Sequence, residues 1–288
     1  MKRREFIKYT TATAAAATLS PVMQVLAGEK IKKNAHDIVR LGNTGIKASR
    51  LAIGTGTGGF NRQSNQTRKL GVPGLADLLR AAYEQGINFW DSADQYGTHP
   101  HLKEGLKGIP REKVVILTKT HATTADEMKA DLQRFRKEIG TDYLDIVLLH
   151  MMTSGDWPMR RRGSMEVLAK ARADGVIRAH GVSCHTLAAL QTAAQSDWVQ
   201  VDLARINSAG TQMDADVATV VKVLQKMHQD GKAIVGMKVF GGGWLRDRPD
   251  ENLKFILDLD CVDAFTIGLE SQDEMWDLLQ RIPAASVP

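Results

Sequence analysis

The sequence predicts an α/β fold, a single-domain (β/α)8 TIM barrel, and three observations support this fold class. From residue 37 onward, short runs of apolar and β-branched residues alternate with longer amphipathic segments, as expected for repeated strand and helix units. Eight strand-like runs occur. Residues 28–288 make up 261 positions, close to the roughly 250 residues that such a barrel typically requires. A doubly wound open sheet is the alternative for the same alternation.

The predicted strands are short runs that are rich in Val, Ile and Leu. They are the segments 49–54, 87–93, 113–120, 144–150, 177–184, 199–206, 233–239 and 264–269. Amphipathic segments between them predict helices at 74–86, 126–140, 164–175, 215–231 and 271–282. In the first of these helices, leucines recur at helical spacing and Gly86 is suited to the C-cap.

The first 27 residues differ in character from the rest of the chain. Arg3 and Arg4 precede a short run that is rich in Ala and Thr, and residues 25–27 offer a small-residue cleavage site. This pattern predicts a signal peptide of the twin-arginine type, which directs folded proteins to export, and therefore a periplasmic protein. The run is too short for a lasting membrane anchor. A basic terminus without an export role is the alternative.

Charge and cysteine content narrow the function classes. Four basic residues and one acidic residue lie in the N-terminal segment, so its removal would lower the net charge from +5 to +2. Such a balance does not indicate a nucleic-acid partner. Cys184 and Cys261 are expected near opposite ends of a barrel, beyond the reach of a disulfide bond. Both thiols are therefore expected to be free.

Residues 51–60, LAIGTGTGGF, place Gly54, Gly56 and Gly59 in the G-x-G-x-x-G spacing of a dinucleotide-binding turn. That motif requires a helix directly after the glycines and an acidic residue about 20 positions further on. Here the glycines lead into a polar segment interrupted by proline, and the first helix is expected only at about residue 74. We therefore interpret the stretch as the first barrel strand and its loop.

Three consecutive predicted strands end on a polar residue that shares a face with apolar ones. Alternate residues of a strand share a face, which puts Asp91, Lys119 and His150 in line with apolar residues of their strands. Barrel enzymes carry their chemistry at the C-terminal ends of the strands, so these three side chains should surround the mouth. Neighbouring strands lie about 4.8 Å apart, which permits an ion pair between Asp91 and Lys119. Tyr96 lies in the following loop and can fold back over them.

The segments DSADQYG (91–97), LTK (117–119) and LLH (148–150) resemble the four-residue site of the aldo-keto reductase family. The resemblance extends from residue 39 to residue 274. It implies reduction of an aldehyde or ketone to an alcohol, or the reverse, with hydride from a nicotinamide cofactor. Tyr96 would be the general acid or base, Lys119 held by Asp91 would lower its pKa, and His150 would orient the carbonyl.

The resemblance also implies a site for NADP(H), with NAD(H) as the alternative. The cofactor positions that it suggests are Gly54, Thr55, Ser183, Cys184, Gln200, Met237, Lys238, Gly241, Gly242, Gly243 and Ser271. Cys184 stands where the family usually has Asn, and Met237 with Lys238 stands where many members have an aromatic residue. Bare backbone N–H groups at Gly241 to Gly243 suit a pyrophosphate. Glu270 stands where basic residues usually contact the 2′-phosphate, which weakens the expectation of NADP(H).

Two other functions stay open. The first is a metal-dependent hydrolase on the same barrel, because several histidines fall at or just past strand ends; they are His99, His101, His121, His150 and His185. The second is a binding protein without catalysis. The expected partners are a small carbonyl or alcohol substrate and the twin-arginine export machinery. No metal, no nucleic acid and no stable membrane insertion are expected.

Overall fold

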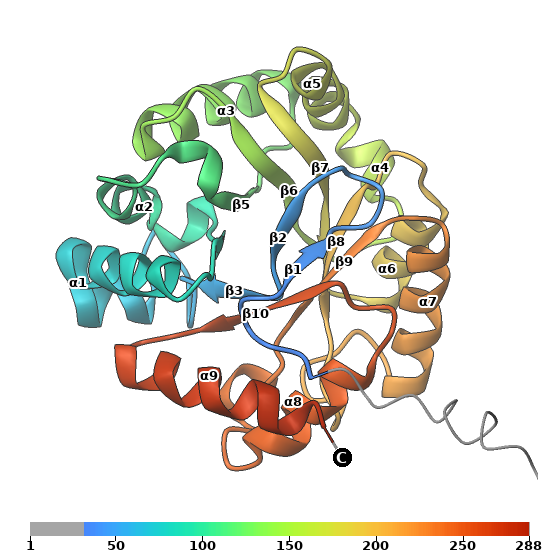
Figure 1. Ribbon diagram of the computed structural model, residues 1–288. Coiled ribbons are helices and arrows are strands. Elements are labelled where there is room, and N and C mark those ends of the chain that lie inside the picture. The colour runs from blue at the N-terminus through green and yellow to red at the C-terminus, as the bar shows by residue number, and fades with distance from the viewer. Residues whose placement is uncertain (1–31, 288) are drawn as a thin grey trace, which may run out of the picture. The chain divides into compact units, whose positions relative to one another are not determined.

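Eight parallel strands form a closed barrel in the computed structural model, which describes residues 32–287 (Figure 1). The strands are β3 (Leu51–Gly54), β4 (Phe89–Asp91), β5 (Val115–Thr120), β6 (Leu144–Met152), β7 (Ile177–Cys184), β8 (Val201–Arg205), β9 (Ala233–Met237) and β10 (Ala264–Gly268). Closure comes from β10, which pairs with both β9 and β3. The predicted barrel and its eight strands are confirmed, and a doubly wound open sheet is excluded.

Alternation along the strands divides the apolar core into two parts. Phe89, Leu117 and Leu148 point into the barrel and pack together there, whereas Trp90 and Ile116 point outward and pack under the helices. This division follows from the two-residue period of a strand. It also fixes which polar residues can reach the barrel mouth.

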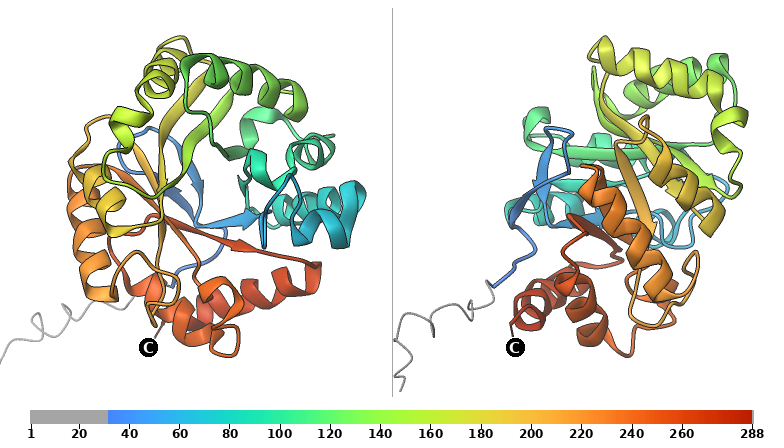
Figure 2. Two further views of the ribbon diagram at one scale, coloured as in Figure 1. Left: turned by 180° about the vertical axis from the view of Figure 1, so that it is seen from behind. Right: turned by 90° about the vertical axis from the view of Figure 1, so that its right-hand side faces the viewer.

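Nine helices of the described part surround this barrel (Figure 2). They are α1 (Asn65–Glu84), α2 (His99–Gly105), α3 (Ala125–Ile139), α4 (Trp157–Arg160), α5 (Arg162–Ala173), α6 (Leu187–Gln195), α7 (Val217–Gln229), α8 (Pro249–Asp258) and α9 (Gln272–Ala285). The five predicted helices correspond to α1, α3, α5, α7 and α9. The others were not predicted from the sequence; α2 and α4 are too short to show a helical period.

Helix α1 begins at Asn65, so the prediction that no helix starts before about residue 74 is wrong. Ser64 caps the helix by accepting the backbone N–H of Thr67 at 3.2 Å. Gly71 then adopts φ +60°, a conformation that suits glycine and allows a kink in front of Pro73. The segment interrupted by proline is therefore a kinked helix, while the closed barrel still excludes a dinucleotide-binding turn of the open-sheet type.

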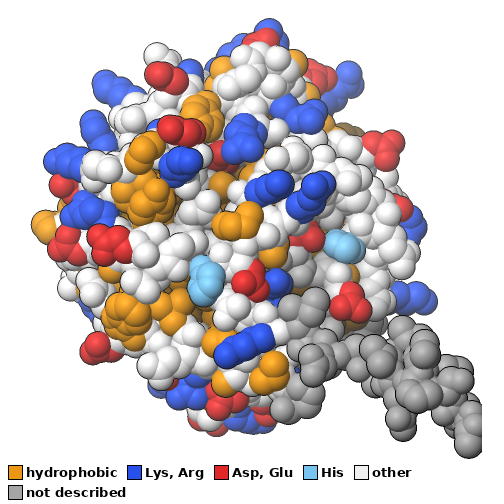
Figure 3. All heavy atoms as spheres, in the orientation of Figure 1, with side chains coloured by type: hydrophobic (Ala, Val, Ile, Leu, Met, Phe, Trp, Pro, Cys, Tyr) orange, Lys and Arg blue, Asp and Glu red, His pale blue; other side chains and the backbone are white. Residues whose placement is uncertain are grey.

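A hairpin closes the N-terminal end of the barrel. Its strands β1 (Ile38–Arg40) and β2 (Lys47–Ser49) pair antiparallel, and Leu41 and Ile46 pack into the inner core. Figure 1 shows the hairpin crossing the barrel on the side of the viewer, and Figure 3 shows basic and acidic side chains interspersed on the same side. A functional site therefore has to lie at the opposite, C-terminal end of the strands.

Both cysteines are free and buried, which confirms the prediction of two free thiols. The predicted signal peptide, residues 1–27, lies outside the described residues. Between residues 32 and 287, no helix has the length and apolar character needed to cross a membrane.

Candidate active site

Asp91 and Lys119 form a buried ion pair at the mouth of the barrel. Asp91 is the last residue of β4, and Lys119 lies on the neighbouring strand β5. The Lys119 ammonium donates to Asp91 Oδ1 and to the carbonyl oxygen of Ser92, the latter at 2.6 Å. Thr266 Oγ1 donates to the other Asp91 oxygen at 3.0 Å. Burial lowers the pKa of Lys119, and the Asp91 carboxylate opposes that shift.

Tyr96 and His150 complete a group of four side chains. Tyr96 ends the 3₁₀ turn η2 (Asp94–Tyr96), and its ring centroid lies 4.9 Å from Lys119 Nζ. The His150 ring, from β6, meets the tyrosine ring edge-on with centroids 5.8 Å apart. The structure therefore brings Asp91, Lys119, Tyr96 and His150 together, although they come from separate strands and a loop.

Burial sets the protonation states in this group. It raises the pKa of Tyr96, and the Asp91 carboxylate adds to that shift. The expected lowering of this pKa by Lys119 is therefore not found in the free site, because burial of the phenol, followed by the Asp91 charge, raises it instead. Burial, Lys119 and the stacked ring of His121 lower the pKa of His150 well below its usual value. At neutral pH, a protonated phenol and a neutral imidazole thus face the mouth.

The loop between β3 and α1 packs flat against the Tyr96 ring. A Cβ added to Gly56 would lie 2.2 Å from Cε2 of Tyr96, and one added to Gly59 would lie 2.3 Å from Cδ1. Neither distance leaves room for a side chain. Gln95 Nε2 donates to the Gly59 carbonyl at 2.7 Å and joins the turn to the loop. Two of the three glycines in the misleading fingerprint thus make room for this tyrosine.

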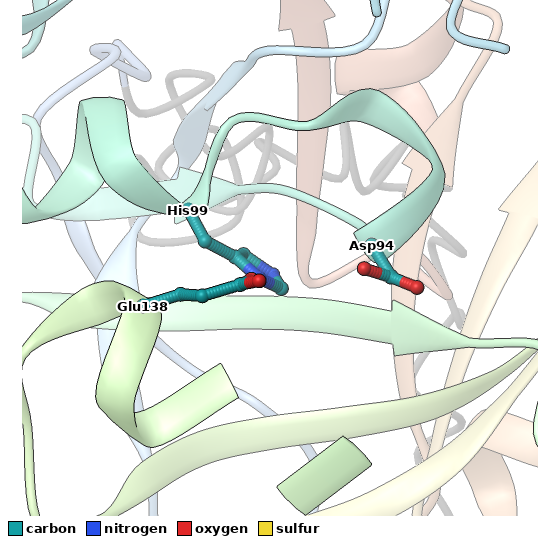
Figure 4. Close-up of side chains that lie close together, drawn as sticks. All are labelled: Asp94, His99 and Glu138. Atoms are coloured by element: carbon teal, nitrogen blue, oxygen red, sulfur yellow. The ribbon is translucent and has the colours of Figure 1, made fainter. Parts of the chain in front are cut away.

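Among residues 32–287, one group of side chains has the spacing of metal ligands, namely Asp94, His99 and Glu138 (Figure 4). Its charges are already compensated, because Arg134 pairs with both Asp94 and Glu138. Arg62 also bridges these two carboxylates. The cluster therefore attaches the turn that contains Tyr96 to helix α3. Because its arginines already neutralise the carboxylates, the cluster does not need a metal cation for charge balance.

A cleft of about 620 Å³ extends from Tyr96 and Asp91 across the ends of β3, β9 and β10. This volume is in the range of small-molecule and cofactor sites. Predicted cofactor residues that line it are Gly54, Met237, Lys238, Gly242 and Gly243. Gly242 and Gly243 have φ of +68° and +103°, and a Cβ added to Gly243 would meet no atom within 4 Å. The bare backbone there suits a pyrophosphate, so the cleft fits a dinucleotide.

Several residues of this cleft were missed by sequence reasoning. They are Asn65 and Lys69 of α1, Arg246 of the loop after η4 (Gly241–Gly243), and Glu274, Asp277 and Arg281 of α9. Arg246 follows the glycine triplet by three positions, which is the one signal that could have identified it. The others come from helix faces, where amphipathic periodicity does not distinguish a cleft wall from a solvated surface.

Two predicted cofactor contacts are wrong in this structure. Gln200 precedes β8 at the N-terminal end of the barrel, accepts the His180 N–H at 3.3 Å, and lines a groove that also contains Lys232. Cys184 points outward into the core under the helices, and burial followed by the nearby Asp202 raises the pKa of its thiol. Neither side chain faces the cleft that contains Tyr96.

Four further residues that were predicted to bind the cofactor have structural roles around the barrel mouth. Thr55 Oγ1 donates to the Asp91 carbonyl at 2.9 Å, and Ser183 Oγ accepts the Met151 N–H at 2.9 Å. Ser271 caps α9 by accepting the backbone N–H of Glu274. Gly241 is buried, with φ +56°, beside Leu245. These residues shape the barrel mouth and the cleft without lining it.

A parallel barrel with an Asp–Lys–Tyr–His group beside a dinucleotide-sized cleft defines the class of protein, a barrel oxidoreductase. A model of the aldo/keto reductase family matches residues 52–264, and the chain belongs to that family.

Individual relatives agree with this membership. The chain is 24% identical to a D-threo-aldose 1-dehydrogenase of a Pseudomonas species, over 72% of this chain and 69% of that protein. It is 34% identical to the methylglyoxal reductase YeaE of Escherichia coli, over 46% of this chain and 45% of that protein. The fold is similar to that of the aldo-keto reductase AKR11C1 from Bacillus halodurans, with a TM-score of 0.69, 18% identity and coverage of 85% and 90% of the two chains.

Proposed function

We propose that this protein is an NAD(P)(H)-dependent oxidoreductase that interconverts a small aldehyde or ketone and its alcohol. The observation that carries the proposal is the convergence of Tyr96, Lys119, Asp91 and His150 at the barrel mouth. Of these four, Asp91 and Tyr96 line the cleft. Relatives named for aldose oxidation and methylglyoxal reduction support a small polar carbonyl compound as substrate.

The chemistry follows from the protonation states of the four side chains. A bound nicotinamide dinucleotide would supply or accept the hydride, and the residues of the chain handle the proton. In reduction, Tyr96 donates its phenolic proton to the carbonyl oxygen, while neutral His150 donates a hydrogen bond to the same oxygen. The phenolate that remains is stabilised by the Lys119 ammonium, which Asp91 holds in place.

The raised pKa of Tyr96 favours one direction of proton transfer. Reduction needs the phenol, which is the form present at neutral pH, whereas alcohol oxidation needs the phenolate. Near neutral pH the phenol is therefore the form ready to donate a proton in reduction, while the net direction depends on the ratio of reduced to oxidised dinucleotide and on the substrate concentrations.

The test is an activity assay of the purified protein with reduced dinucleotide and a panel of aldehydes, ketones and aldoses. Turnover is measured as the loss of the absorbance of the reduced nicotinamide. We expect turnover with at least one small carbonyl compound. Nucleotide binding without turnover of any member of the panel would favour the binding-protein alternative. Absence of nucleotide binding would contradict the proposal.

We also propose export of the folded protein through the twin-arginine pathway, with the dinucleotide bound before transport. The support is the Arg3–Arg4 pair, the short Ala- and Thr-rich run and the cleavage site near Ala27. Changing both arginines to lysine should leave the precursor in the cytoplasm when fractions are compared by immunoblot. An unchanged distribution of the mature protein would contradict export by this route.

A further inference from the structure

The wall of the cleft that follows the C-terminal end of β10 is acidic. Glu270 follows β10 and lines the cleft together with Glu274 and Asp277 of α9. The Glu270 side chain is 17% exposed. Its Oε1 accepts a hydrogen bond from Asn65 Nδ2 at 2.7 Å, and its Oε2 pairs with Lys69. Burial opposes ionisation, but Lys69 and Asn65 outweigh it and lower the pKa of Glu270. The carboxylate is thus both fixed and charged.

Lys69 and Arg281, which line the cleft beside this wall, already have anionic partners. Lys69 pairs with Glu270, and Arg281 pairs with Asp277 at 2.6 Å and with Asp250 at 2.8 Å. Each basic group therefore compensates a carboxylate of the same wall. Arg68 also acts on Glu270, and its guanidinium donates to Asn65 Oδ1 at 2.6 Å; no carboxylate among residues 32–287 forms a salt bridge with it. Lys69 and Arg281, which line the cleft, leave no excess positive charge of their own for a phosphate dianion.

Two backbone donors near the N-terminus of α9 are used by the chain itself. Ser271 Oγ accepts the backbone N–H of Glu274 at 3.1 Å, and the Glu274 carboxylate accepts the backbone N–H of Glu270 at 2.7 Å. Free N–H groups at a helix start are a common phosphate site. Here these two donors are already used by neighbouring side chains.

The middle of the cleft differs in charge. Arg246 lines it beside Gly242 and Gly243, and no carboxylate among residues 32–287 forms a salt bridge with its guanidinium. A pyrophosphate can bind there without competing for the cation. The cleft thus offers positive charge beside its bare glycine backbone, which suits a pyrophosphate, and negative charge at the wall that contains Glu270.

We propose that the cleft binds NAD(H) in preference to NADP(H), with Glu270 accepting hydrogen bonds from the adenosine ribose hydroxyls and repelling a 2′-phosphate. The inference rests on the proposed function, which puts the nicotinamide beside Tyr96 and the adenosine beyond the pyrophosphate. A carboxylate at the ribose is the usual physical device for selecting a free 2′-hydroxyl. A phosphate of nearly two negative charges beside it would be strongly disfavoured.

The experiment compares the dissociation constants of NADH and NADPH for the purified protein by quenching of tryptophan fluorescence, with no substrate present. We expect NADH to bind at least about tenfold more tightly, the size of effect that one unfavourable charge contact produces. Glu270→Gln should lower the ratio of the NADPH to the NADH dissociation constant severalfold, chiefly because NADPH binds more tightly to the variant. Asp273→Asn is the matched control, because Asp273 lies three positions after Glu270, in the first turn of α9, but does not line the cleft.

The outcomes separate the two proposals. Equal binding, or tighter NADPH, would overturn the preference for NAD(H) while leaving the oxidoreductase proposal standing. Absence of binding by either dinucleotide would contradict the proposed function and this inference with it. Thermal melting of both variants shows whether they are folded, and the ratio for the unchanged protein decides the question even if Glu270→Gln does not fold.

Discussion

Two buried aspartates of the barrel, Asp91 and Asp202, have opposite environments. Asp91 points into the mouth, and both of its oxygens have partners, Lys119 and Thr266. Asp202 points outward, is fully buried, and its oxygens accept no hydrogen bond from a nitrogen or oxygen donor of the described residues. Burial, followed by the charge of Asp214, raises the pKa of Asp202 well above its usual value. The difference lies in the partner: a cation stands beside Asp91, whereas Asp202 has none and its burial favours the protonated acid.

The largest expected effect comes from removing the cation beside Asp91. Lys119→Met should lower the turnover rate by about 10²–10⁴-fold and destabilise the fold by about 3–5 kcal/mol, because it leaves a buried charge without its partner. Rate assays and chemical denaturation would measure both.

A second variant separates charge from chemistry. Asp91→Asn combined with Lys119→Met removes both charges and should recover much of the stability without any recovery of activity. If the double variant were as unstable as Lys119→Met alone, the buried charge would not be the cause of the loss.

Crowding the Tyr96 ring should have the next largest effect. Gly59→Ala places a methyl group 2.3 Å from Cδ1 of Tyr96, so the ring has to move and the turnover rate should fall by about 10²-fold. Gly59 does not line the cleft, so dinucleotide binding should stay nearly unchanged. Gly155→Ala is the control, because its added Cβ meets nothing closer than 3.4 Å. Equal rates for the two variants would show that the loop does not position the tyrosine.

Removing the ionisable group at Asp202 should have a smaller effect, and one that depends on pH. Its raised pKa means that the unfolded state loses a proton that the folded state keeps, so stability is lost as the pH rises above about 4. Relative to the unchanged protein, Asp202→Asn should gain up to about 1.4 kcal/mol per pH unit over that range. Denaturation at several pH values measures the slope, and a difference that does not vary with pH would mean that Asp202 is ionised in the fold.

The smallest effect concerns the pH profile of the reaction. Because His150 is already neutral and Tyr96 still protonated near pH 7, the reduction rate at saturating dinucleotide should change little, about threefold or less, between about pH 6 and pH 9. Alcohol oxidation should rise with pH, since it needs the phenolate. A decline of reduction below about pH 6.5 would instead indicate that His150 titrates near its ordinary pKa.

Strand alternation explains which parts of the site could be predicted from the sequence. Apolar residues two positions apart revealed the inner face of β4, β5 and β6, and Asp91, Lys119 and His150 extend those rows. The same rule would have placed Cys184 on the outer face of β7. That position was instead carried over from a family motif, and the prediction failed there.

Other features depend on contacts between distant segments, which no local pattern encodes. Lys69 and Glu270 form an ion pair although they are 201 positions apart in the chain. In the sequence, neither residue can be distinguished from an ordinary solvated helix or loop residue. Gly56 carried a misleading signal, because its role is to make room for a ring 40 positions further on. Such contacts can be identified only from the three-dimensional structure of the closed barrel.

The most direct test of the central claim is a paired measurement on Tyr96→Phe, its turnover rate and its dinucleotide dissociation constant. The phenylalanine ring keeps the packing against Gly56 and Gly59 but removes the proton donor. We predict that carbonyl reduction falls by about 10²–10⁴-fold, while dinucleotide binding and the melting temperature stay close to those of the unchanged protein. A variant that keeps most of its turnover rate would contradict the assignment of Tyr96 as the acid.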